Sequence, residues 1–271
     1  MTDTTTRVRE HYSATGLSER IKSVLATIVP EDQKLTVAQL APLDQFHSCG
    51  ILATTELAEA AEISPSTRVL DLGCGIGGPA RYLAATFGCR VTGVDLSPDF
   101  IDAATYLTVR CELSDRVNFQ IGDALHLPFE DAAFDTVFLQ HVAMNIENRA
   151  ALYAEVSRIL TPKCRFVIHD VLLRYGDVVY PTPRARDAST SYLLSELDTR
   201  TALEQAGFKA TLWRNDTQST LDWFRVAMAS SPSGPNLGAV MGSDFPAIIS
   251  NLARNLRENR LGVLAAVLTC D

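Results

Sequence analysis

The sequence predicts an α/β fold in which a mostly parallel sheet carries helices on both faces. Short apolar runs alternate with helical patterns from residue 66 onward, and such alternation is typical of strands joined by crossover helices. A glycine-rich turn at residues 73–78 directly follows the first apolar run. In open parallel sheets the turn after a strand faces the ligand crevice, so we expect a binding site at this turn.

The expected elements follow the chain in order. An N-terminal segment, residues 1–65, carries helical patterns at 18–28, 37–40 and 50–61. In the core that follows, residues 66–271, Ser97-Pro98 marks a helix start because proline is favoured in the first helical turn. The apolar runs predict strands at 67–72, 90–95, 116–121, 134–139 and 164–171, with helices at 78–87, 97–111 and 149–160.

After the fifth strand the alternation changes. Residues 174–196 are polar and contain two prolines, which predicts a loop with a short helix. A helix at 197–206 then ends at Gly207, a residue favoured just beyond helix ends. The last two strands are expected at 208–213 and 261–269, with a helical insertion at 217–258 between them. We therefore expect seven strands, with cap insertions at about 174–196 and 217–258.

Composition narrows the class of protein. A chain of 271 residues, 46% of them hydrophobic, suits one large domain or one domain with an elaborated lid. Its net charge of −8 predicts repulsion from phosphate backbones, so we expect no nucleic-acid partner. No apolar run reaches 18 residues, which predicts no membrane insertion, and the first residues carry no apolar stretch of a secretory signal.

The six cysteines are scattered and form no C-x-x-C pair or His/Cys cluster. We therefore expect neither a metal site nor a disulfide scaffold. Free thiols fit a reducing compartment, so the expected location is the cytoplasm. The expected oligomeric state is a monomer or a homodimer.

The glycine turn leaves two interpretations open. Gly73, Gly75 and Gly78 satisfy G-x-G-x-x-G, and Asp95 lies about twenty residues beyond, as in dinucleotide-binding turns. An NAD-dependent oxidoreductase is therefore one hypothesis. Asp71, two residues before the first glycine, favours another, because a carboxylate repels a pyrophosphate and attracts a ligand with positive charge. The oxidoreductase also predicts a catalytic Tyr-x-x-x-Lys pair, and the sequence contains none.

With Asp71, Asp95 and the segment Gly122-Asp123-Ala124, the chain resembles the class I S-adenosylmethionine-dependent methyltransferases. The resemblance is closest to the small-molecule group that includes quinone-pathway C-methyltransferases and sarcosine/dimethylglycine N-methyltransferases. It implies a Rossmann-like seven-stranded sheet with an antiparallel last strand and an N-terminal helical lid. It also implies in-line transfer of a methyl group to an N, O or C atom of a small-molecule acceptor, without a metal.

The resemblance also assigns residues to the methyl donor. Asp95 matches the position that holds the ribose hydroxyls, and Asp123 matches the acid that meets the adenine amino group. Tyr12 resembles the tyrosine of an N-terminal lid. The full set expected to bind the donor is Asp71, Gly73, Cys74, Gly75, Gly77, Asp95, Leu96, Asp123, Ala124, Leu125, Gln140 and Tyr12.

Three residues are candidates for the acceptor side. His141 follows the fourth strand and is either a general base, a positioning residue or an ordinary buried histidine. His169 and Asp170 end the fifth strand, where alternation exposes only one of them to the crevice; the resemblance favours Asp170, with a structural cap as the alternative. His47 lies in a segment that helps to cover the donor in related enzymes, although that segment also fits a plain turn.

Overall fold

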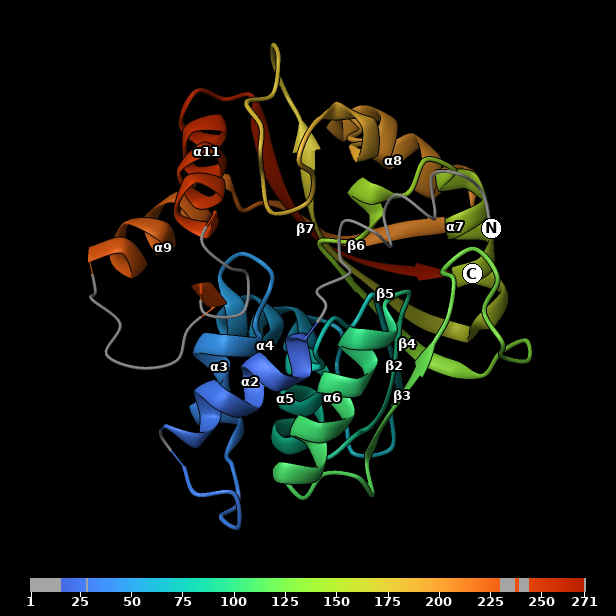
Figure 1. The fold of residues 1–271 in the computed structure, drawn as a ribbon. Coiled ribbons are helices and arrows are strands. Elements are labelled where there is room, and N and C mark those ends of the chain that lie inside the picture. The colour runs from blue at the N-terminus through green and yellow to red at the C-terminus, as the bar shows by residue number, and fades with distance from the viewer. Residues whose placement is uncertain (1–15, 28, 230–236, 239–243, 271) are drawn as a thin grey trace.

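A seven-stranded sheet forms the centre of the molecule (Figure 1). The computed structural model describes residues 16–27, 29–229, 237–238 and 244–270. The strand order is β3-β2-β1-β4-β5-β7-β6, in which β7 runs antiparallel to both of its neighbours and the other pairs are parallel. The strands are β1 (Arg68–Leu72), β2 (Arg90–Asp95), β3 (Val117–Ile121), β4 (Phe134–Gln140), β5 (Leu160–Leu173), β6 (Phe208–Asn215) and β7 (Leu261–Cys270). The predicted fold class is confirmed.

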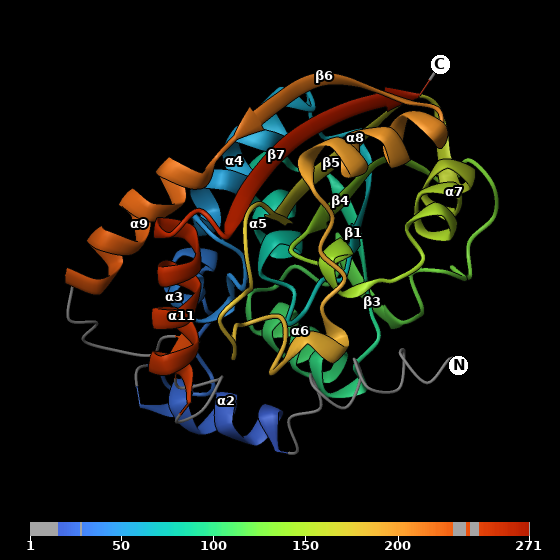
Figure 2. The same ribbon diagram turned by 90° about the horizontal axis from the view of Figure 1, so that it is seen from above.

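Helices cover both faces of the sheet (Figure 2). Strand side chains alternate between the faces, so Val69 of β1 packs with one helical layer and Leu70 with the other. The layer next to Val69 contains α4 (Gly50–Ala60), α5 (Gly78–Phe87) and α6 (Pro98–Arg110). The layer next to Leu70 contains α7 (Arg149–Ile159) and α8 (Glu196–Gln205).

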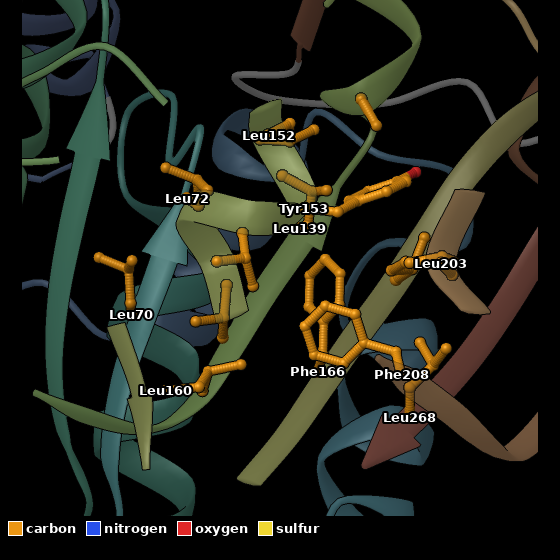
Figure 3. Close-up of a cluster of buried hydrophobic side chains, with 14 of the residues drawn as sticks. Leu70, Leu72, Leu139, Leu152, Tyr153, Leu160, Phe166, Leu203, Phe208 and Leu268 are labelled. Atoms are coloured by element: carbon orange, nitrogen blue, oxygen red, sulfur yellow. The ribbon is translucent and has the colours of Figure 1, made fainter. Parts of the chain in front are cut away.

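The larger core cluster is centred on Phe166 of β5 (Figure 3). Its ring lies 6.0 Å from the ring of Tyr153 on α7 and 5.0 Å from that of Phe208 on β6. All three side chains are fully buried. Aromatic pairs at these distances add to the stabilisation from apolar burial, and they join α7 to β5 and to the edge strand β6.

The N-terminal segment shares a core with the rest of the molecule. In α2 (Leu17–Ala26), Leu17, Ile21 and Leu25 recur every four residues and form one apolar stripe. This stripe packs on α6 and on α3 (Val37–Asp44). Thr36 begins α3 with a reciprocal capping box to Gln39.

The two cap insertions lie at the carboxyl ends of the strands, where α9 (Thr217–Ala229) and α11 (Phe245–Arg257) pack side by side (Figure 1). Phe224 of α9 and Leu252 of α11 cover Val171 of β5 and Val263 of β7. The other insertion is mostly loop, with the short helix η2 (Ala188–Thr190). Both insertions fall where the sequence predicts them.

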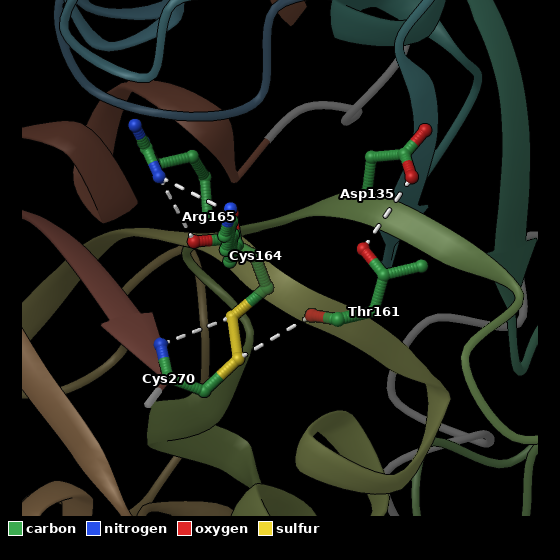
Figure 4. The surroundings of a disulfide bond; sticks show 6 residues. Asp135, Thr161, Cys164, Arg165 and Cys270 are labelled. Carbon is green, nitrogen blue, oxygen red and sulfur yellow. Dashed lines mark hydrogen bonds between the residues drawn. A yellow bond between two sulfur atoms is a disulfide. The ribbon is translucent and has the colours of Figure 1, made fainter.

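Two features differ from expectation. Strand β5 begins at Leu160 rather than at residue 164, because Leu160 pairs with Phe134 at the start of β4. The expectation of free thiols is wrong for Cys164 and Cys270, which form a disulfide with an S–S distance of 2.13 Å between β5 and the end of β7 (Figure 4). The other four cysteines are free and buried. In the part of the chain that the structure describes, no helix is long and apolar enough to cross a membrane.

Candidate active site

A cavity of about 510 Å³ opens at the carboxyl ends of β1, β2 and β4, which is a size typical of small-molecule sites. The glycine turn, the segment before α4 and both cap insertions contribute to its wall. Most of the residues expected to bind the donor line it: Asp71, Gly73, Cys74, Gly75, Asp95, Leu96, Asp123, Ala124, Leu125 and Gln140. Tyr12 lies outside the described residues.

The glycines of the turn serve different purposes. Gly73, Gly75 and Gly77 all have positive φ, of 77°, 53° and 79°. Gly75 faces the cavity, and a Cβ there would find its nearest neighbour, on Phe46, at 3.4 Å. At Gly77 a Cβ would meet the ring of Phe119 at 2.5 Å, and Gly77 is not among the lining residues. Gly77 therefore allows α5 to pack closely, and its predicted contact with the donor finds no support in this geometry.

Asp71 supplies a buried negative charge without a full set of partners. It is 2% exposed, and its Oδ2 forms no hydrogen bond in the described part of the chain. Burial, followed by the charge of Asp95, raises its pKa to about 7. A cationic group in the cavity would pair with this oxygen and offset both effects. The site therefore fits the positively charged portion of S-adenosylmethionine.

Asp95 has two oxygens held by the backbone. Its Oδ2 accepts from the Gly75 amide at 2.9 Å and its Oδ1 from the Ser97 amide at 2.9 Å. Each oxygen retains a second lone pair, which suits the two hydroxyls of a ribose. The cap of α6 is formed by the Ser97 side chain, which accepts from the Phe100 amide, so Asp95 is not needed for capping.

Asp123 follows β3 in a tight turn. Its Oδ1 accepts from the Leu125 amide at 3.0 Å, and its Oδ2 forms no hydrogen bond in the described residues. Asp123 is among the residues that line the cavity. This arrangement can accept a hydrogen bond from an adenine amino group.

A buried ion pair lies next to the glycine turn and joins α5 to α3. Arg81 of α5 donates to Asp44 of α3 at 2.9 Å, and both side chains are 0% exposed. Arg81 also donates to the Ile76 and Ala104 carbonyls. The sequence analysis does not single out this pair, because 37 residues separate its members and no local pattern joins them.

His47 and His141 face the cavity from different segments. The His47 Nε2 lies 2.9 Å from the Gly50 carbonyl, which can only accept, so the second nitrogen, Nδ1, carries the lone pair. Thr54 lies 3.0 Å from the same Nε2 and also 3.3 Å from Gln140 Nε2. Burial lowers the pKa of His47 to about 4 and that of His141 to about 3. Both imidazoles are therefore neutral at physiological pH.

Asp170 is not where the prediction puts it. Neither Asp170 nor His169 is among the residues that line the cavity. The Asp170 carboxylate accepts from the Met144 amide at 3.0 Å and from the Val171 amide at 2.9 Å, and burial raises its pKa to about 6. This is the capping alternative: Asp170 holds the short helix η1 (Ala143–Asn145) after β4. Its contact with the acceptor remains a prediction.

The remaining wall of the cavity is apolar. The lining residues that come after residue 170 are Val171, Thr182, Pro183, Arg184, Trp223, Phe224, Leu237, Phe245, Ile249 and Leu252. None of these described residues is acidic, and Arg184 alone is charged. Asp71, Asp95 and Asp123 thus gather at the ends of β1–β3, Glu147 follows η1, and the described lining residues under the cap carry no carboxylate.

Comparison with known proteins identifies the family. A family model described as a methyltransferase domain matches residues 70–168. Methyltransferase GfsG of Streptomyces halstedii is 32% identical over 198 residues, which cover 71% of this chain and 67% of that protein. The chain belongs to the S-adenosylmethionine-dependent methyltransferases. The methyltransferase transfers a methyl group from S-adenosylmethionine to a small molecule, and the comparisons give no support to an NAD-dependent oxidoreductase.

Other relatives match shorter parts. The glycine/sarcosine/dimethylglycine N-methyltransferase of Actinopolyspora halophila is 34% identical over 166 residues, which cover 61% of this methyltransferase but 27% of that protein. Geranyl diphosphate C-methyltransferase from Streptomyces coelicolor A3(2) has the same fold, with a TM-score of 0.75 at 18% identity, and the match covers 100% of this chain and 99% of that one.

Proposed function

We propose that this methyltransferase holds S-adenosylmethionine on the acidic side of the cavity and methylates an apolar, non-cationic acceptor in the chamber under the cap. The observation that carries this proposal is the segregation of charge. Asp71, Asp95 and Asp123 lie at the ends of β1–β3, Asp44 is paired with Arg81, and Glu147 follows η1. The described lining residues beyond residue 170, which belong to β5 and the cap, include no carboxylate.

This separation of charged from apolar lining residues favours neutral, apolar acceptors over cationic ones. Cationic acceptors need a carboxylate partner, because an unpaired buried charge is costly. Aromatic faces such as Trp223 attract cations by about 0.5–2 kcal/mol, but the buried guanidinium of Arg184 lies in the same wall and repels them. An apolar phenol, alkene or ring hydroxyl meets neither difficulty and gains from the apolar surface that it buries.

The roles of the side chains follow from their positions. We assign the ribose to Asp95, the adenine amino group to Asp123 and the charged end of the donor to Asp71. S-adenosylmethionine supplies a methyl group already activated on a sulfonium. The protein's own contribution is to align the acceptor, exclude water and leave neutral imidazoles, on His47 and His141, beside the acceptor. His141 is then the general base where the acceptor must lose a proton.

Three further expectations belong to the proposal. The segment of residues 1–65, including Tyr12, acts as a lid over the donor; its support is that Phe46 and His47 line the cavity. A monomer or homodimer is expected. A cytoplasmic location rests on the four unpaired thiols, and the disulfide between Cys164 and Cys270 argues against it.

A labelled-methyl assay tests the acceptor class. The enzyme is incubated with methyl-labelled S-adenosylmethionine and either apolar phenols of the tocopherol type or sarcosine. We expect product with a phenol and none with sarcosine. The variant Trp223→Ala should raise the KM for the phenol and leave the Kd for S-adenosylhomocysteine unchanged. Methylation of sarcosine at a higher kcat/KM than any phenol would contradict the proposal.

A further inference from the structure

Three histidines from separate segments meet at the inner end of the cavity. The ring centroids of His47 and His141 lie 6.3 Å apart, and the ring of His169 lies 5.9 Å from the first and 5.2 Å from the second. His47 and His141 line the cavity, whereas His169 is 0% exposed and lies behind them. The roles assigned so far make no use of His169.

The buried nitrogens of this cluster lack partners. Neither Nδ1 nor Nε2 of His169 forms a hydrogen bond in the described part of the chain, and the same is true of His141 Nε2. Buried polar groups are normally paired with protein atoms or with ordered water. One such nitrogen on each ring would give a bridging water two partners.

A carboxylate lies beyond His169. The Asp216 Oδ2 is 4.0 Å from the His169 Nε2. Arg214 holds Asp216 through two hydrogen bonds, of 2.5 Å to Oδ1 and 2.9 Å to Oδ2, and it also donates to Glu56 at 2.6 Å. The side chain of Asp216 is 5% exposed, whereas those of Arg214 and Glu56 are each 44% exposed. Polar groups thus follow one another from the cavity wall to the surface, with a gap of 4.0 Å between His169 and Asp216.

Methyl transfer to a neutral acceptor releases a proton, which these polar groups can carry. When a methyl group replaces hydrogen on a neutral hydroxyl or carbon, the sulfur keeps the electron pair of the broken C–S bond. A lone pair or π pair of the acceptor forms the new bond, and the X–H pair stays on the acceptor as the proton leaves. One proton is therefore released in each transfer. Burial lowers the pKa of His141 to about 3, which disfavours retention of the proton on this imidazole.

We propose that His169 conducts the acceptor's proton away from His141: its Nδ1 takes a proton through a buried water from His141, and its Nε2 gives one up to the carboxylate of Asp216, which also orients the ring. This inference rests on the proposed function, in which the acceptor loses a proton. Because the Asp216 carboxylate accepts hydrogen bonds, it favours hydrogen on the His169 Nε2 and leaves the lone pair on Nδ1 for the water. The charged and titratable groups that face His169 are His141, His47, Asp216 and Arg214.

Nuclear magnetic resonance of ¹⁵N-histidine-labelled protein tests the orientation directly. The chain has five histidines, and His169→Gln assigns the signal of interest. With S-adenosylhomocysteine bound, we expect His169 to be neutral and protonated at Nε2 throughout pH 6–8. Asp216→Asn should abolish this preference. The matched control Asp222→Asn, on the exposed face of α9, should preserve it. Hydrogen on Nδ1 in the wild type, or an unchanged tautomer in Asp216→Asn, would overturn the proposal.

A kinetic measurement tests the relay itself. With an acceptor from the labelled-methyl assay, His169→Gln should lower the single-turnover rate at least about tenfold and introduce a solvent deuterium isotope effect. The Kd for S-adenosylhomocysteine and the melting temperature should stay at wild-type values. A rate within about twofold of wild type, with no isotope effect, would contradict the relay. Failure of the wild-type protein to bind S-adenosylhomocysteine would instead refute the proposed function. The failure of the relay and the failure of the proposed function therefore give different results.

Discussion

Lowering the pH from 8 to 6 should weaken the binding of S-adenosylmethionine about tenfold, because the donor requires Asp71 in its ionised form. The pKa of Asp71 in the free protein is about 7. About nine-tenths of the molecules are then ionised at pH 8 and about one-tenth at pH 6, and apparent affinity scales with the competent fraction. Isothermal titration calorimetry at half-unit pH steps measures the effect.

The sign of the effect on stability is the opposite. The pKa of Asp71 is raised from an ordinary 3.8 to about 7, so the native state binds the proton more tightly than the unfolded chain. Its contribution to the free energy of unfolding is therefore fully present below pH 3.8 and is lost as the pH rises through 7. Asp71→Asn should remove the pH dependence of binding and separate it from titration of the ligand. An equal Kd at pH 6 and pH 8 in the wild-type protein would refute the reasoning.

Three predictions concern the structure around the site. Arg81→Met leaves Asp44 buried without its partner, so it should lower the free energy of unfolding in urea by about 3–5 kcal/mol; the same value as wild type would contradict the buried pair. Gly78→Ala places a Cβ 2.2 Å from the Asp44 carbonyl. It should lower the melting temperature more than Gly176→Ala, where the positive φ of 69° strains an alanine but no atom of the described residues lies within 4 Å of the added Cβ. Phe166→Ala, in the fully buried aromatic cluster, should reduce stability by about 3–5 kcal/mol, and a loss below 1 kcal/mol in a urea titration would argue against close packing there.

The core of the fold is predictable because its signals are local. The apolar run of residues 90–95 and the helical pattern of residues 78–87 coincide with β2 and α5 as the structure has them. The predicted association of the glycine turn with Asp95 also rests on a short spacing in the sequence. In the structure the Gly75 amide donates a hydrogen bond to the Asp95 carboxylate, at 2.9 Å. Position at a strand's carboxyl end was sufficient to place most of the residues expected to bind the donor on the cavity wall.

Contacts between distant segments could not be found in this way. The Asp44–Arg81 pair and the cluster of His47, His141 and His169 depend on how helices and strands pack, and no spacing in the sequence records it. The resemblance favours Asp170, yet Asp170 is not among the residues that line the cavity, and backbone amides occupy its carboxylate. The cystine between Cys164 and Cys270 was missed for the same reason, since 106 residues separate the two cysteines.

Titration of S-adenosylhomocysteine into wild-type protein and Asp95→Ala, with NAD as the comparison ligand, tests the assignment of the donor site most directly. We expect one molecule of S-adenosylhomocysteine to bind per chain, no binding of NAD, and a loss of about 1.5–3 kcal/mol in Asp95→Ala, because hydrogen bonds to a charged group are lost. The assignment would be contradicted by binding of NAD without S-adenosylhomocysteine, or by native affinity in the variant.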